Sequence, residues 1–338
     1  MQPIQVVGQG IAGTMLSWFL LKHGFQIQVF DPGDGPNASL AAGALINPVT
    51  GKAWRSTWLA PEVFPHAEDT YRQLSEVLQF PFFQPLNMYK VLNSVKEQND
   101  YQAAAEHGGY LTGSIAYFPW SATDYPFGFG EITGAARIAG AELLTRFRAY
   151  LKQQGLLVER CWQIEDGANA ERIVFCDGYG ASTPGHPFSY LPWQWAKGEY
   201  LLIQTPSLPK DKAFKAATTL VPMTESGVFY AGGTFQWHFD SLLPSAEKRE
   251  ELEAGVRAFA GNNYHVLHHG AAVRPAVRDR RPYVGSHPVD SRFWIFNGFG
   301  TKGYTLAPFF AAQLVRHWKF ETPLSAAVAP SRFAALLA

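Results

Sequence analysis

The sequence predicts an α/β fold that begins with a parallel β-α-β unit. Three observations near the N-terminus predict it: an apolar strand at residues 3–7, helical apolar spacing at residues 11–23, and a second β-patterned run at residues 26–30. Gly8, Gly10 and Gly13 form a GxGxxG turn between the first strand and the helix, and Asp31 closes the second strand. Strand, turn, helix, strand and acid therefore follow one another in the order that a nucleotide-binding unit requires.

Each part of this unit suits a dinucleotide. Gly8 permits the turn, Gly10 lets the backbone approach a pyrophosphate, and Gly13 lets the helix pack on the strand. The helix N-terminus, at Ile11 and Ala12, offers amide groups and a positive dipole end to the phosphates. Asp31 can accept hydrogen bonds from ribose hydroxyls. FAD and NAD share this pattern, and an ordinary αβ turn without a ligand is the alternative.

Composition narrows the classes of protein. The chain has 338 residues, enough for two domains, and 28 basic and 28 acidic side chains, so its average field favours neither nucleic acid nor an anionic membrane. Its two cysteines, Cys161 and Cys176, lie in no metal-ligand spacing, so we expect neither a metal site nor a disulfide framework. The first strand begins at residue 3 and no apolar run reaches membrane-spanning length, so we expect a cytoplasmic protein.

The remaining pattern predicts alternating helices and strands. Helices are expected at residues 61–79, 95–107, 134–154, about 245–259, with Ser245 as the N-cap, and about 305–318, and strands at residues 82–92, 156–164, 172–175, 193–203, 227–234 and 293–296.

Three further stretches could approach a ligand. Small residues crowd residues 37–51, which suits a backbone that passes against a flat ligand, with a flexible loop as the alternative. Residues 176–181 form a glycine turn after a strand, at the edge of a sheet where ligands bind; a plain turn is the alternative. The third stretch, at residues 108–130, is either a wall for an apolar substrate or a packing segment. Its aromatic residues are Tyr117, Phe118, Trp120, Tyr125, Phe127 and Phe129.

Strand, glycine turn and helix occur a second time near the C-terminus. The strand at residues 293–296 leads into Gly298, Gly300 and Gly303 and then into the last helix, which accepts Pro308 in its first turn. A helix N-terminus can stabilise negative charge on a ring carbonyl or ring nitrogen as well as on a phosphate.

These motifs together resemble the D-amino-acid oxidase superfamily of FAD-dependent oxidoreductases. The glycine oxidases and the oxidase half of the bifunctional tRNA methylaminomethyl-thiouridine enzyme are nearest in pattern. The resemblance rests on the N-terminal unit with Asp31, on residues 39–45, on Arg274-Pro with Asp279 and residues 282–285, and on residues 298–308. It is weak between residues 56 and 130. It implies a Rossmann-like FAD-binding domain from residues 1–55, 135–185 and 265–338. It also implies a substrate domain with a mixed, largely antiparallel β-sheet from residues 56–134 and 186–264.

The resemblance also implies site residues and non-covalent FAD, since no Cys or His stands where relatives attach flavin. The implied cofactor contacts are Gly8, Gly10, Ile11, Ala12, Gly13 and Asp31, then Ser39, Gly43 and Ala44 near the flavin, Gly178, and Gly300, Thr301, Lys302, Gly303 and Tyr304 at the pyrimidine end of the ring.

Arg274 is the candidate for binding substrate. In amino-acid-oxidising relatives an arginine at this motif position clamps the carboxylate, which its planar fork can hold bidentately. A structural arginine, paired with Asp279 or a backbone carbonyl, is the alternative. Tyr230, Phe235 and Gln236 are candidates for the substrate wall, with core packing as the alternative for Tyr230 and Phe235.

The implied reaction is oxidation of the C–N bond of an amino acid or secondary amine by hydride transfer to flavin N5. The expected partner is a small amine or amino acid, with no nucleic acid or membrane, and the oligomeric state is left open. One alternative is a tRNA-modifying oxidoreductase acting on a carboxymethylaminomethyl uridine, which zero net charge disfavours. Another is a nucleotide-binding module without catalysis, which would not need a carboxylate clamp.

Overall fold

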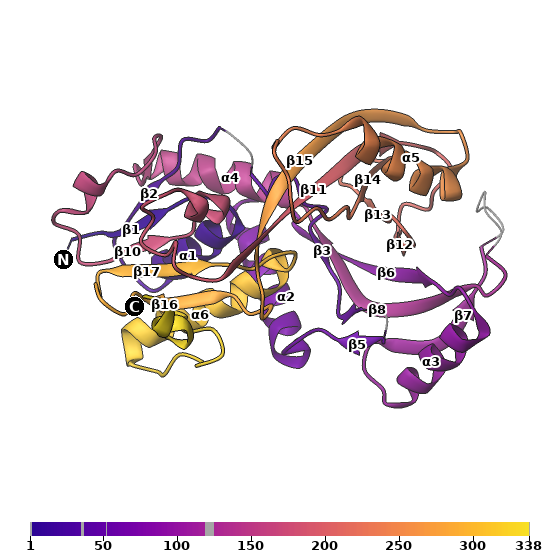
Figure 1. Cartoon of the computed structure of the whole chain (residues 1–338), viewed down its shortest axis with the longest axis horizontal. Helices are drawn as coiled ribbons and strands as arrows, with labels where there is room; N and C mark the ends of the chain where they lie inside the picture. Colours follow the sequence, from indigo (N-terminus) through magenta and orange to yellow (C-terminus); the bar gives the residue numbers. More distant parts are fainter. Residues whose placement is uncertain (1, 35–36, 52, 119–124, 338) are drawn as a thin grey trace.

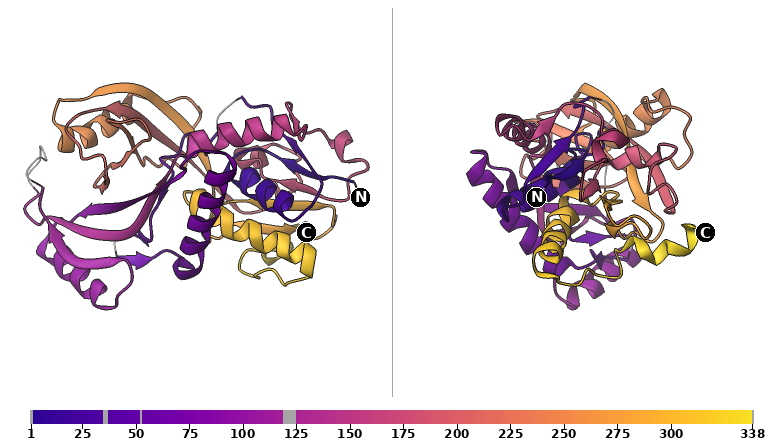
Figure 2. Two further views of the ribbon diagram at one scale, coloured as in Figure 1. Left: turned by 180° about the vertical axis from the view of Figure 1, so that it is seen from behind. Right: turned by 90° about the vertical axis from the view of Figure 1, so that its left-hand side faces the viewer.

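Two large β-sheets occupy opposite halves of the molecule (Figure 1). The computed structural model describes residues 2–34, 37–51, 53–118 and 125–337. Both chain ends lie in the half that contains the smaller sheet, as the view from behind also shows (Figure 2). The chain therefore starts and finishes in one sheet and builds the other from its middle.

The six-stranded sheet contains the N-terminal unit. Its order is β16-β17-β10-β1-β2-β9, parallel except for the antiparallel pair β16 and β17. The strands are β1 (Ile4–Val7), β2 (Ile27–Phe30), β9 (Leu157–Val158), β10 (Ile173–Phe175), β16 (Tyr283–Ser286) and β17 (Phe293–Asn297). The carboxyl ends of β1, β2, β10 and β17 therefore meet at one edge of the sheet, where ligands bind in open α/β folds.

The nine-stranded sheet is mixed and largely antiparallel, as the resemblance implies. Its order is β15-β11-β14-β13-β12-β6-β8-β3, with β7 paired to β8, and β12 runs parallel to β6. The strands are β3 (Leu45–Ile46), β6 (Phe83–Val91), β7 (Leu111–Ala116), β8 (Phe129–Ile138), β11 (Trp193–Gln204), β12 (Lys212–Lys215), β13 (Thr219–Pro222), β14 (Val228–Gly232) and β15 (His265–Val277); β4 (Val49–Thr50) and β5 (Arg55–Ser56) form a separate pair.

The helices cover these sheets. They are α1 (Ile11–Lys22), α2 (Ala60–Val77), α3 (Val95–Glu106), α4 (Gly140–Gln153), α5 (Ala246–Ala260) and α6 (Gly303–Phe320), with short 3-10 segments η1 (Ile164–Gly167), η2 (Gly178–Ser182) and η3 (Pro330–Leu337). Met15 and Leu16 of α1 share one buried cluster with Leu314 and Val315 of α6, so the first and last helices pack on the same strands. None of the helices in the described ranges combines the length and apolar character needed to cross a bilayer.

Most predicted elements are present, including the Ser245 cap, whose hydroxyl accepts a hydrogen bond from Lys248 N at 3.3 Å. The helix predicted to begin at residue 134 is wrong at its start. Residues 134–138 belong to β8, of which residues 135–138 pair with β6, and α4 begins only at Gly140. The helical preference of Ala135 and Ala136 gives way because both residues are buried between strands. The strand predicted at residues 156–164 ends at Val158.

Most of the described aromatic residues of the 108–130 stretch pack into the core of the larger sheet, whereas Tyr117 is exposed. Phe129 is 1% exposed, and Phe118 and Tyr125 pack against it. The substrate-wall interpretation of this stretch is therefore wrong for its described residues; Trp120 lies outside them.

The two-domain boundaries stay a prediction. The whole of β15 belongs to the nine-stranded sheet, although residues 265–277 were expected to join the FAD-binding part. This strand ends at Val277, close to the turn that precedes β16, so the chain passes between the two sheets here.

Candidate active site

A cavity of about 1090 Å³ is lined by both sheets. One wall consists of the turns at the carboxyl ends of β1, β2 and β10, and the other consists of residues from β11 to β15. Single ligand pockets usually measure about 300–1,000 Å³, so this cavity has room for a dinucleotide together with a small substrate.

The β1–α1 turn has the tight geometry that its glycines predict. Gly8 has φ +97°, and a Cβ placed there would lie 2.8 Å from Asp177 Cα. A Cβ on Gly13 would overlap the carbonyl oxygen of Gly8, so this glycine lets α1 approach β1. Gly8 and Gly10 line the cavity, whereas Gly13 lies behind the turn.

The first turn of α1 faces the cavity at Ile11 and Ala12. Gly10, the N-cap, has no side chain to accept from the first amides, and Ile11 N donates to Ser39 Oγ at 3.0 Å. A helix N-terminus without a side-chain cap from its own chain segment is suited to an anion.

Asp31 is held firmly at the end of β2. Its Oδ2 accepts from Gln9 N at 2.7 Å, and its Oδ1 accepts from Arg148 Nη1 at 2.7 Å and from Gly33 N at 2.9 Å. Arg148, on α4, also lines the cavity. The carboxylate therefore has a fixed orientation beside the glycine turn, as a ribose-binding acid requires.

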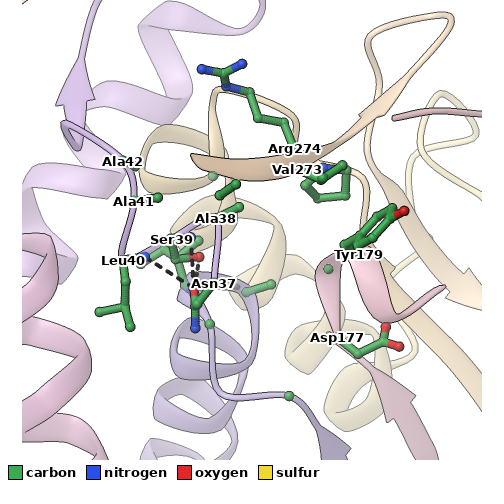
Figure 3. Close-up of a pocket in the computed structure, with 18 of the residues that line it drawn as sticks. Asn37, Ala38, Ser39, Leu40, Ala41, Ala42, Asp177, Tyr179, Val273 and Arg274 are labelled. Atoms are coloured by element: carbon green, nitrogen blue, oxygen red, sulfur yellow. Dashed lines mark hydrogen bonds between the residues drawn. The ribbon is translucent and has the colours of Figure 1, made fainter. Parts of the chain in front are cut away.

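The small-residue stretch after β2 is an ordered turn where it lines the cavity. Asn37 Oδ1 accepts from Ser39 N at 2.9 Å and from Leu40 N at 3.2 Å (Figure 3). Ser39 O accepts from the Tyr304 hydroxyl at 2.9 Å, and a Cβ on Gly43 would lie 2.6 Å from the Tyr230 ring. Ser39, Gly43 and Ala44 all line the cavity, and at Gly43 this turn contacts the wall formed by the nine-stranded sheet.

The second glycine turn, after β10, returns the chain to the same cavity. Asn297 Nδ2 donates to Gly178 O at 3.0 Å and to Asp177 Oδ1 at 3.3 Å, which ties the turn to β17. Gly178, Asp177 and Tyr179 line the cavity, and Asp177 and Tyr179 lie on the side opposite the guanidinium of Arg274 (Figure 3).

The C-terminal turn supplies Gly300, Thr301, Gly303 and Tyr304 to the cavity. Gly300 N donates to Pro275 O at 3.0 Å, which connects this turn to the residue after Arg274. Lys302 does not line the cavity. It is the N-cap of α6, and burial together with Arg281 and Arg280 lowers the pKa of its ammonium.

Arg274 lies on β15 and lines the cavity, and its guanidinium lies on the side of this strand away from Asn37 and Asp177 (Figure 3). Its Nη1 donates to Thr234 O at 3.0 Å, and its guanidinium lies 4.4 Å from the centre of the Phe235 ring. Burial lowers the pKa of Arg274, and the neighbouring Tyr230 hydroxyl opposes this shift. Pairing with Asp279 is wrong, because Asp279 contacts Arg332 at 3.0 Å. Pairing with a backbone carbonyl, that of Thr234, does occur. It uses only one of the five N–H donors of the guanidinium, so other donors remain for a ligand.

Two of the three residues predicted for the substrate wall line the cavity, and the third does not. Tyr230 and Phe235 line the cavity; Tyr230 stacks on Tyr200 with ring centres 5.3 Å apart, and Phe235 is 50% exposed. Gln236 does not line the cavity. Its backbone pairs with Lys197 in both directions, at 2.9 and 3.0 Å, and this pairing fixes the segment that carries Phe235.

Sequence reasoning missed several residues of the cavity. Asp177 and Tyr179 stand in a turn that the sequence did indicate, so their position after the strand could have found them. Arg148 and Lys215 carried no such signal. The helix that became α4 was predicted without any indication that it contacts Asp31, and β12 was not predicted at all. Among the described residues, no group of three or more His, Cys, Asp or Glu side chains could hold a metal ion.

Comparison with known proteins identifies the family. The DAO family model, described as FAD dependent oxidoreductase, matches residues 4–317. The chain belongs to this family. It is therefore an FAD-dependent oxidoreductase, as the motifs at both ends of the chain predict.

Individual relatives of this oxidoreductase are distant. It is 29% identical to the glycine oxidase of Bacillus subtilis (strain 168) over 122 residues, which are 36% of this chain and 32% of that protein, so the alignment spans about a third of the relative. A glycine oxidase from Geobacillus kaustophilus has a similar structure, with a TM-score of 0.79 at 18% identity, covering 97% of this chain and 98% of that one. An iminodiacetate oxidase from Chelativorans sp. BNC1 gives a TM-score of 0.78 at 17% identity with the same coverage. These structures show the same fold.

The cavity fits FAD. A Cβ at Gly8 would meet the backbone of Asp177 and a Cβ at Gly10 would lie 3.1 Å from Ser39 Oγ, so these glycines would leave a narrow path, free of side chains, for a pyrophosphate. Asp31 stands at one end of this path and the N-terminus of α6 at the other. The residues that would hold FAD thus come from the turns after β1, β2, β10 and β17.

Proposed function

We propose that this flavoenzyme oxidises the C–N bond of an amino acid or of a secondary amine that carries a carboxylate. The observation that supports the proposal is the placement of Arg274, a desolvated guanidinium on the wall of the cavity that also contains the dinucleotide-binding turns. A buried cation whose N–H donors are mostly unused is suited to a carboxylate, which satisfies two of them at once.

Arg274 would bind the carboxylate and thereby fix which face of the neighbouring carbon meets the cofactor. The Thr234 carbonyl accepts a hydrogen bond from the guanidinium, and the Phe235 ring lies against it. Tyr230 stays protonated, because burial raises the pKa of its hydroxyl, and it can donate a hydrogen bond to substrate. Bound FAD would supply the acceptor for a hydride from the carbon next to the amine. No side-chain base is needed if the amine enters neutral.

The N-terminus of α6 would stabilise negative charge at the far side of the cofactor site. Gly303 and Tyr304 begin this helix and line the cavity, and the helix dipole places partial positive charge there. The Tyr304 hydroxyl is engaged by Ser39 O, so this residue acts through its backbone and ring.

The names of the relatives guide the choice of substrates for a test. The purified protein should be yellow, or become yellow with FAD, and should lose its absorbance near 450 nm when a substrate is added without oxygen. The panel is glycine, sarcosine, proline, iminodiacetate and D-amino acids, with methylamine and dimethylamine as controls without a carboxylate. A protein that stays colourless with FAD, or one that amines bleach equally well with and without a carboxylate, would contradict the proposal.

A further inference from the structure

Lys215 lines the same cavity as Arg274, and the proposed reaction assigns no role to its positive charge. It lies on β12, at the end of the strand, and lines the cavity together with Thr219, Val221 and Tyr230. The side chain is half-buried, and in the part of the chain that the structure describes its ammonium has neither a hydrogen bond nor an ion pair. Burial lowers the pKa of this ammonium, and no carboxylate opposes the shift.

The charge of the cavity is distributed unevenly. Its described acidic residues are Asp31, Asp34 and Asp177, and all three follow strands of the six-stranded sheet. The wall formed by the nine-stranded sheet contributes two cations, Arg274 and Lys215, and none of the described carboxylates. A desolvated cation without a partner destabilises the protein unless a ligand supplies the opposite charge.

The strand next to Lys215 does not supply that charge. Lys90 of β6 stands opposite Lys215 in register, and it too is a lysine. The Lys90 ammonium donates to Gly51 O at 3.0 Å and lies 4.0 Å from the Trp54 ring centre. Like charges opposite each other on adjacent strands are destabilising. The positive charge of Lys90 therefore makes binding of an anion at Lys215 more favourable.

Strand order places the two cations at a distance. Lys215 stands opposite Thr219 of β13, which stands opposite Gly232 of β14, so two strand spacings, about 10 Å, separate Lys215 from the strand of Tyr230. Arg274 lies on β15, two strands further along the order. The backbones of the two residues are therefore four strand spacings apart, which favours a ligand with a separate acidic group for each cation.

We propose that the substrate carries a second acidic group on an arm, which Lys215 binds while Arg274 binds the carboxylate next to the oxidised C–N bond. This inference rests on the proposed function and names its substrate class: amino acids or secondary amines with two acidic groups. Tyr230 and Val221 line the cavity between the two ends of such a molecule. Sarcosine and glycine would occupy the Arg274 end alone.

The first test uses N-substituted glycines with an acidic arm of increasing length: N-carboxymethyl, N-(2-carboxyethyl) and N-(3-carboxypropyl) glycine, with N-methylglycine as reference. The readout is the ratio of kcat/KM between each acidic-arm compound and N-methylglycine. We expect at least one arm length to exceed the reference about 10-fold or more, and Lys215→Met to lower that ratio about 10-fold or more. Lys215→Arg should keep most of the preference. Equal ratios in the parent and in Lys215→Met would overturn the inference.

Lys212→Met is the matched control. Lys212 stands at the other end of β12, contacts Asp211 at 2.7 Å and does not line the cavity, so its loss should leave the ratio as in the parent. Melting temperature and FAD dissociation constant are measured for every variant. A Lys215→Met protein that loses FAD affinity rather than the arm preference would show that the lysine serves the cofactor and would overturn the inference.

The second test needs no turnover. Ethers that replace the amine N–H by oxygen cannot be oxidised at a C–N bond, so diglycolate and (2-carboxyethoxy)acetate are compared with methoxyacetate by calorimetric titration of the FAD-loaded protein. Tighter binding of a diacid, about 10-fold or more, that disappears in Lys215→Met would support the inference. Equal binding of diacid and monoacid, or no binding of either, would count against it. If no amine in any panel is oxidised, the proposed reaction fails, and this titration still decides whether Lys215 binds an acidic arm.

Discussion

The guanidinium of Arg274 lies against the backbone of Gly198 so closely that a Cβ at residue 198 would overlap its terminal atoms. Gly198 is an interior residue of β11, and its backbone conformation is open to other residues, so its lack of a side chain serves the arginine. The overlapping atoms are the far end of a flexible side chain, which can move without a change in the strand.

Gly198→Ala should therefore impair substrate binding more than stability. We expect KM for the preferred amine to rise about 10-fold or more, as for the loss of a charged hydrogen bond, while the melting temperature stays within a few degrees of the parent. Steady-state kinetics and thermal melts measure the two effects. The double variant with Arg274→Met should be scarcely worse than Arg274→Met alone, because both changes remove the same contact. Additive losses would show that Gly198 acts by another route.

Arg274 itself should separate substrate binding from cofactor binding. Arg274→Met removes the guanidinium, and Arg274→Lys keeps a charge without the planar fork. We expect KM to rise about 10- to 100-fold in Arg274→Met, corresponding to about 1.5–3 kcal/mol, with a smaller rise in Arg274→Lys. FAD affinity, measured by the quenching of flavin fluorescence, should change little. A parallel loss of FAD from both variants would assign Arg274 a structural role.

The pair of Asp31 and Arg148 should control FAD affinity. Asp31→Asn removes the negative charge of the carboxylate that accepts hydrogen bonds from Gln9 N and Arg148 Nη1. We expect FAD to bind about 10-fold more weakly, with KM for the amine nearly unchanged. Arg148→Met should weaken FAD binding less, because Gln9 N and Gly33 N still orient the carboxylate.

Lys152→Met provides the control for this pair. Lys152 is on the same helix but is exposed and contacts Glu159 at 2.7 Å, so the variant should bind FAD as the parent does. Fluorescence titration of the apoprotein measures all of these affinities. Unaltered FAD binding in Asp31→Asn would contradict the ribose role of this acid.

The sequence predicted the parts of the site that depend on local geometry. The turn requires a glycine at Gly8, and the approach of α1 to β1 requires a glycine at Gly13. Both requirements can be recognised from the residue types and their spacing alone. Arg148 lies 117 residues from Asp31, and nothing local to either residue indicates their contact. Only the packing of α4 against α1 and against β9, the strand next to β2, brings them together.

The substrate side was harder to predict for a related reason. β12 is four residues long and has a lysine at each end, so its pattern resembles a surface loop, and only its pairing with β6 and β13 shows that Lys215 faces a cavity. The start of α4 was misplaced because alanines in β8 are held by neighbouring strands. In both places long-range pairing determines the structure more strongly than local preference does.

His66 should make stability depend on pH. Its ring stacks on Phe19 with centres 5.6 Å apart and meets the edge of Phe309 at 5.8 Å, and its buried Nε2 has no hydrogen-bond partner among the described residues. Burial lowers the pKa of His66 below its ordinary value near 6.5. The folded protein therefore keeps this ring neutral at a pH at which the unfolded chain already binds a proton.

The sign of the effect follows from linkage. Between the ordinary pKa and the lowered one the unfolded state holds more protons, so the contribution of His66 to the free energy of unfolding is complete above pH 6.5 and falls as the pH decreases towards the lowered pKa. We expect His66→Phe, which preserves the stacking, to lose less unfolding free energy than the parent between pH 7.5 and 5.5. Urea melts at the two pH values give the difference directly. His107→Gln, at an exposed position after α3, should follow the parent. An equal loss in His66→Phe and the parent would show that another group governs the acid sensitivity of the fold.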